Sequence, residues 1–394
     1  MTKFFLLFFT IVFLNMGLSK AQTATAIQPY TSFLKSQNKT AKDYILDLFD
    51  NHDIVIICER NHGEMSQYDL ITDIISDKRF IDKVGNIFTE IGVSSLDPAL
   101  NTFLHTRNIA ADTVLERIIN FQRNCSFWPL WSNKNYSFLL NTLYSLNNNL
   151  PADKAINAYP SDLPFTWAGA DTSSMLQLRT MIGNRDSIMA SQIILKFNQI
   201  KNSNQKRKKA LVIMNFRHAF NQEFFISGRS LKNTAYFLFR QYGNQVANVM
   251  LNTVGMNKDG FTLLQEGRWD GAFKVLDKEN IGFDLKNTPF GKDSFDLWPF
   301  KTDFTYSDIF TGFAFFSPIE KHHMIEGFPG LIDGSFRSEL MKRIDLIGVV
   351  GGEFSKMANL KKAFQSDSSF LNKEEDKRYF QLDSLIQKRD RWRN

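Results

Sequence analysis

The sequence predicts an α/β fold: a mainly parallel sheet with helices on both faces, a helical insertion and an irregular, Phe-rich C-terminal region. Two short apolar, β-branched runs, residues 53–58 (DIVIIC) and 86–91 (NIFTEI), are typical of fully buried strands. Between them, residues 64–76 carry apolar side chains at helical spacing. A strand, a helix and a second strand within about 40 residues indicate a right-handed crossover between parallel strands.

The alternation of strands and helices continues along the chain. Further strands are expected at residues 166–171, 210–216 and 247–254, and helices at residues 183–200 and 234–242. Residues 95–150 lack this alternation, so they predict a helical insertion or cap, with helices near residues 112–122 and 136–147.

The last third of the chain is harder to assign. Residues 257–318 are rich in Gly, Asp and Phe, residues 344–350 are expected to form an edge strand, and residues 374–394 a charged helix. Phe contributes 38 residues to the chain, against 10 Tyr and 6 Trp. These rings either pack the added segments together or form an aromatic wall over a binding crevice, and packing is the favoured hypothesis.

The first 21 residues have the features of a secretory signal peptide. Lys3 gives a positive start, residues 4–18 are almost entirely apolar, and residues 19–21 (SKA) offer small side chains for cleavage. The apolar run is shorter than the ~20 residues that a membrane span needs. We therefore expect an exported, periplasmic or secreted protein without a membrane span. The mature chain would have a lead-in over residues 22–49, a core over 50–255 and an extension over 256–394 that packs on the core.

Composition excludes several classes of protein. With 43% hydrophobic and 22% charged residues the chain is neither disordered nor a coiled coil. Its net charge of +6 is too small to indicate a nucleic-acid partner, and the dense basic run at residues 206–209 is expected to be a solvated loop. Cys58 and Cys125 form either a disulfide or two buried free thiols.

Polar residues follow three of the predicted strands. Glu59 and His62 come after the first strand, Glu90 lies near the end of the second, and His218 follows residues 210–216. Because ligands of open α/β sheets bind beyond the carboxyl ends of the strands, we expect these four side chains to converge. An imidazole held by a carboxylate can act as a general base on water, and a second carboxylate nearby can supply an acid. The same four side chains would also suit Zn, Mn or Fe.

Three other features of the sequence are weaker candidates. Arg185 and Asp186 either reach the site or simply begin a helix, where an acidic residue is favoured by the helix dipole. Asp171 ends a predicted strand. His322 and His323 are expected in a surface turn, because adjacent side chains diverge and do not share one metal.

Four blocks in order resemble the erythromycin esterase-like superfamily. Residues 59–63 (ERNHG) resemble its G-E-x-x-H-G motif, and Thr89-Glu90 resembles its strand glutamate. The later blocks are residues 185–190 (RDSIMA), 215–218 (NFRH) and the Tyr-Gly pair at 242–243, so that the resemblance covers roughly residues 50–255. Three positions depart from the family: Asn215 and Phe216 replace the first His and the Asn of H-N-x-H, and Cys58 replaces a Gly.

The resemblance implies a hydrolase that cleaves an ester or lactone. With the signal-like start and the aromatic residues, we expect it to be exported, to act on a small, apolar substrate and to need no cofactor. His62 would activate water with the support of Glu59 and Glu90, and His218 would assist at the oxyanion or the leaving group. Arg185 and Asn215 would bind substrate. The related haem-binding uptake and Tiki/ChaN-like proteins imply the alternative: a divalent metal or haem held by Glu59, His62, Glu90 and His218, in a metal-dependent peptidase or a non-catalytic binding module.

Overall fold

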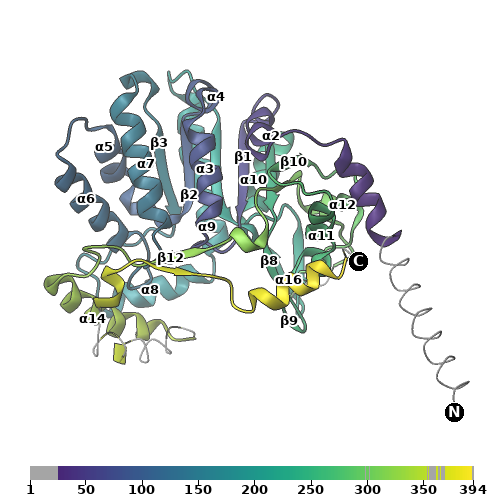
Figure 1. Cartoon of the computed structure of the whole chain (residues 1–394). Helices are drawn as coiled ribbons and strands as arrows, with labels where there is room; N and C mark the ends of the chain where they lie inside the picture. The colour runs from purple at the N-terminus through teal and green to yellow at the C-terminus, as the bar shows by residue number, and fades with distance from the viewer. Residues whose placement is uncertain are drawn as a thin grey trace, which may run out of the picture.

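A seven-stranded sheet forms the centre of the computed structural model (Figure 1). The structure describes residues 25–297, 299–300, 302–352, 354, 361–362, 364 and 369–392, so the predicted signal peptide lies outside the described residues. The strand order is β10-β11-β7-β1-β4-β2-β3. All neighbouring pairs are parallel except β10 and β11, which confirms the predicted α/β class.

The strands of this sheet are short and deeply buried. They are β1 (Ile54–Glu59), β2 (Asn86–Val93), β3 (Asn157–Asp162), β4 (Ala210–Asn215), β7 (Val246–Leu251), β10 (Ile281–Asp284) and β11 (Gly312–Phe315). Every residue of β1, β2 and β7 is buried, which explains their continuous apolar sequences. β10 and β11 lie in the segment expected to pack on the core from outside, but they belong to the central sheet itself.

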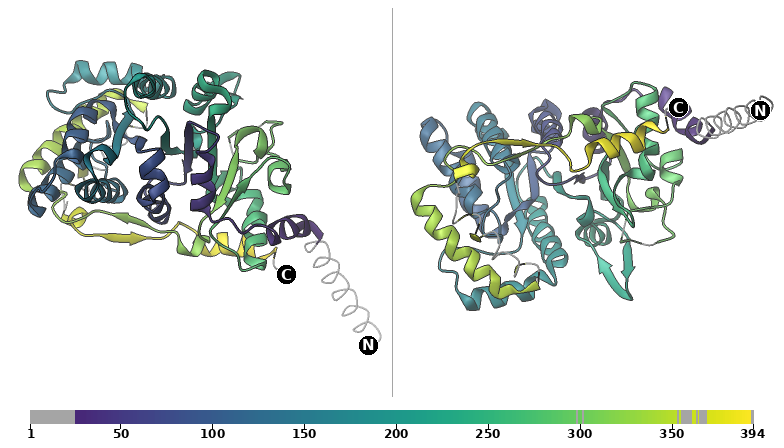
Figure 2. Two further views of the ribbon diagram at one scale, coloured as in Figure 1. Left: turned by 90° about the horizontal axis from the view of Figure 1, so that it is seen from above. Right: turned by 60° about the horizontal axis from the view of Figure 1, so that its bottom comes forward.

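Helices cover both faces of the sheet, as predicted (Figure 2). One face packs against α2 (Ala41–Leu48), α3 (Ser66–Ser76), α4 (Lys78–Lys83), α5 (Asp97–His105), α6 (Ala111–Asn124) and α7 (Asn135–Asn149). The other packs against helical residues 25–35, α9 (Arg185–Asn202), α10 (Thr234–Tyr242) and α11 (Arg268–Val275). The predicted insertion at residues 95–150 thus supplies helices that pack on the sheet, and the loop between α6 and α7 reaches the carboxyl ends of the strands.

The C-terminal part of the chain wraps across the molecule. Its helices are α12 (Pro289–Lys292), α13 (Tyr306–Ile309), α14 (Gly334–Ile347) and α16 (Leu382–Asp390), and α8 (Thr172–Ile182) packs against α14. Three small ribbons complete the fold: β5 (Glu223–Ile226) with β6 (Arg229–Lys232), β8 (Val254–Asn257) with β9 (Gly260–Leu263), and β12 (Met324–Glu326) with β13 (Glu375–Lys377). Each helix in the described part of the chain is too short or too polar to span a membrane.

Three element predictions were wrong. The strand expected at residues 166–171 is a loop that ends in Asp171, the N-cap of α8, and the strand of this region is β3 instead. Residues 344–350 end α14 and enter a 3-10 turn rather than forming an edge strand. Residues 374–394 contain β13 before α16, so the terminal helix is shorter than expected.

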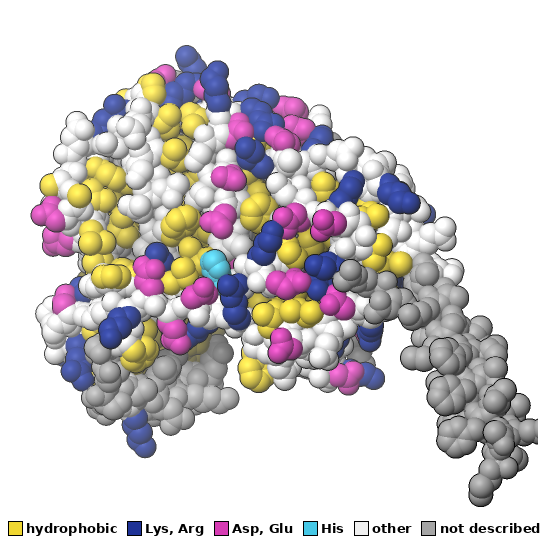
Figure 3. All heavy atoms as spheres, viewed as in Figure 1, with side chains coloured by type: hydrophobic (Ala, Val, Ile, Leu, Met, Phe, Trp, Pro, Cys, Tyr) yellow, Lys and Arg dark blue, Asp and Glu magenta, His cyan; other side chains and the backbone are white. Residues whose placement is uncertain are grey.

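Phe residues of the C-terminal third pack in the main core, as the favoured hypothesis predicts: Phe290, Phe295, Phe300, Phe310, Phe313 and Phe315 are all buried there. Phe295, Phe300 and Phe310 surround Phe220 in edge-on contacts with ring centroids 4.9–5.8 Å apart. Cys58 and Cys125 are both buried and free, so the disulfide alternative is wrong. On the face drawn in Figure 3, the coloured Lys and Arg side chains lie among Asp and Glu side chains.

Candidate active site

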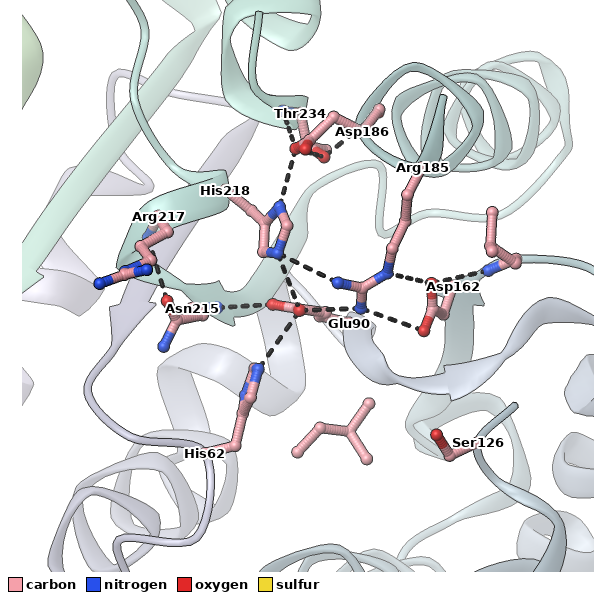
Figure 4. A network of polar contacts seen from close by, with 12 residues as sticks. His62, Glu90, Ser126, Asp162, Arg185, Asp186, Asn215, Arg217, His218 and Thr234 are labelled. Carbon is pink, nitrogen blue, oxygen red and sulfur yellow. Dashed lines mark hydrogen bonds and ion pairs between the residues drawn. The ribbon is translucent and has the colours of Figure 1, made fainter. Parts of the chain in front are cut away.

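A cavity of about 310 Å³ lies at the carboxyl ends of β1, β4, β2 and β3, which are neighbours in the sheet. Its polar lining residues come from the ends of these strands and the segments that follow them: Asn61, His62, Glu90, Ser126, Asp162, Arg185, Asn215 and His218. The aromatic residues Phe127, Trp128 and Trp131 of the α6–α7 loop form another wall. The structure therefore brings the predicted side chains together at one edge of the sheet (Figure 4).

His62 lies between two buried carboxylates. Its Nδ1 is 2.9 Å from Glu59 Oε2, and its Nε2 is 3.2 Å from Glu90 Oε1. The other oxygen of Glu59 accepts a hydrogen bond of 2.6 Å from the Tyr68 hydroxyl. Trp131 contacts the imidazole edge-on, with ring centroids 5.7 Å apart. Both nitrogens of His62 therefore face an acceptor, which is the environment of an imidazolium.

Glu90 owes its position to an irregularity in β2. The register with β3 shifts between Thr89 and Val93, and Gly92 has a φ of 121°, in the region that favours glycine. A Cβ at Gly92 would lie 2.6 Å from Pro160 Cβ, so the two strands approach closely here. The distortion occurs where the Glu90 carboxylate turns into the site, as is common for bulges beside active sites.

His218 forms a second imidazole–carboxylate pair on the opposite side of Glu90. Its Nδ1 is 2.8 Å from Asp186 Oδ1, which also accepts hydrogen bonds from the backbone N–H and the hydroxyl of Thr234. Its Nε2 lies 3.2 Å from Glu90 Oε1 and 3.2 Å from Arg185 Nη1. His218 Nε2 thus faces an acceptor and a donor at once.

Arg185, the first residue of α9, links Glu90 to the end of β3. Its Nη2 donates to Glu90 Oε1 at 2.9 Å, and its Nε donates to Asp162 Oδ1 at 2.7 Å. Asp162 is 4% exposed and Glu90 2% exposed, so one guanidinium forms ion pairs with two buried carboxylates. The planar fork of Arg suits this double contact better than a Lys ammonium would.

Asn215 has structural partners on every side. Its backbone N–H donates to Glu90 Oε2 at 2.8 Å, its Oδ1 accepts from the backbone of Arg217 at 3.2 Å, and its Nδ2 donates to the carbonyl of Arg60. It caps the 3-10 turn η3 (Phe216–His218) that carries His218. Asn215 lines the cavity, so its predicted contact with substrate stays a prediction.

The charges of the site shift the pKa values of its members strongly. Burial alone would lower the pKa of His62, but Glu90 and Glu59 outweigh it and raise that pKa to about 10. For His218, Glu90 and Asp186 likewise outweigh burial and raise the pKa to about 9. Burial disfavours the Glu90 carboxylate, yet His218, His62 and Arg185 hold its pKa well below the ordinary value. At neutral pH the resting site therefore holds two imidazolium ions around an ionised Glu90.

No protein-family model matches this chain. No curated protein matches it either. It is similar to several solved structures at 9–11% sequence identity.

One is a Bacillus cereus protein (11% identity, 73% of this chain and 96% of that chain, TM-score 0.44). Another is a variant of the erythromycin esterase EreC in its open conformation (11%, 68% and 91%, TM-score 0.44). A third is a succinoglycan biosynthesis protein (9%, 74% and 96%, TM-score 0.48). One of these structures is thus of an erythromycin esterase, the kind of protein that the sequence motifs resemble.

Several partners in the site were missed or left undecided by the sequence. Asp162 was missed because β3 was not predicted, and Tyr68 because its helical spacing indicated only a core position. Asp186 lies in the first turn of α9, where an acidic residue was equally consistent with the helix dipole alone. Asp171, the weaker candidate, is an exposed N-cap whose side chain binds Ser174, and it is not among the residues that line the cavity.

A buried ion pair lies directly behind the loop that carries His62. Arg60 and Glu64 are fully buried, with Arg60 Nη1 2.7 Å from Glu64 Oε2. Residues 319–326, which include β12 and are called the strap below, pack against this pair through His322, which is 1% exposed. The prediction that His322 lies in a surface turn is therefore wrong. Two hydrogen bonds hold the strap in place: the Met65 N–H donates to the His323 carbonyl, and the His323 N–H donates to Glu64 Oε1.

The donor set does not fit a divalent metal well. Glu59, His62 and Glu90 do offer ligand atoms within 4.8 Å of one another. However, each nitrogen of His62 faces a different carboxylate, and only one lone pair of an imidazole can bind a metal. The Arg185 guanidinium lies 2.9 Å from Glu90 Oε1 and 3.2 Å from His218 Nε2, where it already supplies the positive charge that a shared metal would provide.

A haem does not fit the site either. The cavity of about 310 Å³ is at the lower end of the volumes that hold small ligands, too small for a haem macrocycle. An axial imidazole would also need a free ring nitrogen, whereas both nitrogens of His62 and of His218 face carboxylates.

Proposed function

We propose that this protein is a hydrolase that cleaves an ester or a lactone of a small substrate. The observation that carries the proposal is a pair of imidazole–carboxylate dyads, His62–Glu59 and His218–Asp186, whose Nε2 atoms both lie 3.2 Å from Glu90 Oε1 at a cavity. Hydrolysis of an ester needs a base that takes a proton from water and an acid that protonates the departing oxygen. Two dyads beside one cavity can supply both groups.

The hydrogen-bond partners favour His218 as the base. Losing the Nε2 proton of His218 leaves a lone pair that can accept from Arg185 Nη1, 3.2 Å away, while Asp186 still holds the proton on Nδ1. Nε2 of both rings faces Glu90 Oε1, but at His62 none of the described residues donates to the lone pair that loss of this proton would leave. These roles reverse the assignment that the family resemblance implies, and they use the same two dyads.

The proposed reaction conserves its protons. Neutral His218 takes a proton from water as the oxygen of that water bonds to the acyl carbon, and the carbonyl electron pair moves to the oxygen. Arg185 and the His62 imidazolium stabilise this oxyanion. When the bond to the alkoxy oxygen breaks, His62 Nε2 gives its proton to the leaving group. Glu90 Oε1 is 3.2 Å from both imidazoles, so it can pass the proton of His218 back to His62.

The walls of the cavity support a substrate with one apolar and one polar side. Trp128, Trp131 and Phe127 line the cavity of about 310 Å³ together with the polar groups of His62 and Arg185. This volume favours a compact acyl group or lactone ring. We also propose export, supported by the signal-like pattern of residues 1–21.

The test is hydrolysis by the chain from Gln22 onward of a panel of p-nitrophenyl esters (acetate to octanoate) and five- and six-membered lactones. His62→Asn and His218→Asn are each expected to lower kcat/KM by about 10²–10⁴. His105→Asn is the matched control, because His105 is exposed on α5 and is not among the residues that line the cavity. Equal rates in wild type and both site variants would reject the proposal. A wild-type protein that hydrolyses none of the esters and lactones would also reject it, in favour of a non-catalytic binding module.

A further inference from the structure

A second cavity, of about 260 Å³, lies beside α11 and shares no lining residue with the first. Asp270 and Phe273 of α11, Phe315 at the end of β11, and Arg389 of α16 form its inner part. Figure 1 shows α11 and α16 close together near the C-terminal end of the chain. The C-terminal helix therefore closes this cavity.

The closure depends on a close approach of two backbones. Gly267 precedes α11 with a φ of 86°, and a Cβ there would lie 3.0 Å from the Cα of Arg389. A larger residue would push α16 away from α11. The cavity is thus built by specific packing of α16.

Asp270 is a buried carboxyl group without partners. It is 1% exposed, and among the described residues neither of its oxygens accepts a hydrogen bond or forms an ion pair. A buried carboxylate in this state is costly unless a donor is supplied. By contrast, the carboxylates Glu59, Glu90 and Asp162 of the first site all have donors.

The cations around this cavity are occupied elsewhere. Lys278 donates to the carbonyls of Leu34 and Gln37, Lys321 pairs with Glu279, and Arg389 pairs with Glu320 and Asp390. Lys274 lies 4.0 Å from Glu320, so among the lining residues this leaves Asp270 and the exposed Asp277. None of these cations forms a hydrogen bond with the Asp270 carboxylate.

We propose that this second cavity binds a small primary amine, whose ammonium group donates to both oxygens of Asp270. An ammonium group offers three donors in a compact space. Phe273 and Phe315, stacked 4.0 Å apart at 10°, provide an apolar wall for a short alkyl stem. A metal ion would require several oxygen ligands, whereas the buried lining offers the single carboxylate of Asp270.

The test is calorimetric titration of the chain from Gln22 onward with butylamine, 1-butanol and butyrate, which have similar shapes and different charges. Butylamine is expected to bind with one-to-one stoichiometry, at least tenfold more tightly than butanol or butyrate. Asp270→Asn should weaken butylamine binding at least tenfold. Asp259→Asn, an exposed change in the β8–β9 turn, should leave it unchanged.

A second readout does not depend on any variant. Burial raises the pKa of Asp270 to about 7, so binding an ammonium at pH 7 should release part of a proton. Titration in two buffers of different ionisation enthalpy measures this release. The proposal is overturned if butylamine does not bind at 10 mM, if butanol binds equally well, or if binding releases no proton. Ester hydrolysis by Asp270→Asn should be unchanged, so this proposal and the proposed function can fail separately.

Discussion

His62 and His218 face each other across a single oxygen atom, since Nε2 of each imidazole lies 3.2 Å from Glu90 Oε1. Each ring is held on its other nitrogen by a carboxylate of its own, Glu59 or Asp186. Ionised Glu90 lets two like charges share this space, and it couples their protonation. The site consequently behaves as one titrating unit, which gives it a characteristic pH dependence.

The rate of ester hydrolysis is expected to rise with pH far into the alkaline range. If neutral His218 is the base and protonated His62 the acid, kcat/KM should increase about tenfold per pH unit at neutral pH. The rising limb should bend near pH 9 and the falling limb should begin near pH 10, as the two pKa values require. Stopped-flow or plate assays from pH 6 to 11 measure this profile.

Single variants then assign the two limbs. His218→Asn should remove the rising limb, and His62→Asn should remove the falling limb, each on a much reduced rate. The opposite pattern would assign the base to His62. An optimum near pH 7 in the wild type would contradict the charge state of the resting site.

Tyr68→Phe tests the carboxylate that holds His62. The Tyr68 hydroxyl donates to Glu59 Oε1 at 2.6 Å and is buried. Its loss should lower the free energy of unfolding by about 1.5–3 kcal/mol, because one oxygen of a buried carboxylate is left without a donor. Glu59 would then hold the His62 proton more strongly, so the falling limb should move to higher pH.

Tyr242→Phe is the control for this change. Tyr242 also donates to a side chain, Asn198 Oδ1 at 2.9 Å, and it is only partly buried, on α10. Urea unfolding should show a smaller loss there and an unchanged pH profile. A Tyr68→Phe variant with wild-type stability and an unmoved falling limb would show that Tyr68 does not position Glu59.

The sequence identified the parts of the site that lie on buried central strands. β1, β2 and β4 have continuous apolar sequences, and the polar residues that follow them are conspicuous for that reason. β3 was missed because Pro160 interrupts its pattern, which an edge strand tolerates. Asp162, the partner of Arg185, was lost with it.

Long-range packing explains the other differences. Ile344 and Ile347 belong to a short apolar run that periodicity alone cannot assign to a helix or a strand, and burial of both on α14 decides it. His322 was placed at the surface from its neighbours in sequence, whereas the strap carries it against Arg60, 262 positions earlier. The residues next to His322 in the sequence give no indication of its contact with Arg60.

Arg185→Met tests the guanidinium that joins Glu90 and Asp162. Removing it leaves two buried carboxylates without their shared cation, so the free energy of unfolding should fall by about 3–5 kcal/mol. His218 should lose its proton at higher pH once the neighbouring positive charge is gone, which moves the rising limb upward. Arg185→Lys should give an intermediate loss, because an ammonium cannot reproduce both contacts.

The matched control is Arg179→Met, an exposed position on α8. Its unfolding free energy should change by less than about 0.5 kcal/mol. Wild-type stability in Arg185→Met would mean that Glu90 and Asp162 find other partners.

His322→Gln is expected to alter the acid side of the stability curve. Burial and the nearby Arg60 lower the pKa of His322 to about 3. Since the unfolded chain takes up this proton near pH 6.5, wild type should lose stability as pH falls from about 6.5 to 3, by up to about 5 kcal/mol.

Gln can still donate to the Ser317 carbonyl that His322 Nε2 contacts at 2.9 Å. The variant should therefore lack this decline, whereas the exposed control His105→Gln should keep it. Parallel curves for wild type and His322→Gln in urea unfolding at pH 7, 5 and 4 would contradict a neutral, buried His322.

Asp270→Asn should have the opposite pH dependence. The pKa of Asp270 is about 7 in the folded protein because the group is buried, compared with 3.8 for the exposed group. Wild type should therefore lose stability as pH rises from about 4 to 7, by up to about 4 kcal/mol in amine-free buffer. The Asn variant has no proton to lose, so its advantage over wild type should grow across this range, and Asp259→Asn should show none.

Adding butylamine should restore part of the wild-type stability at pH 7 and leave Asp270→Asn unaffected. Thermal unfolding at pH 5, 6 and 7 with and without butylamine measures both effects. A variant that is less stable than wild type at every pH would show that the carboxylate of Asp270 has a structural partner.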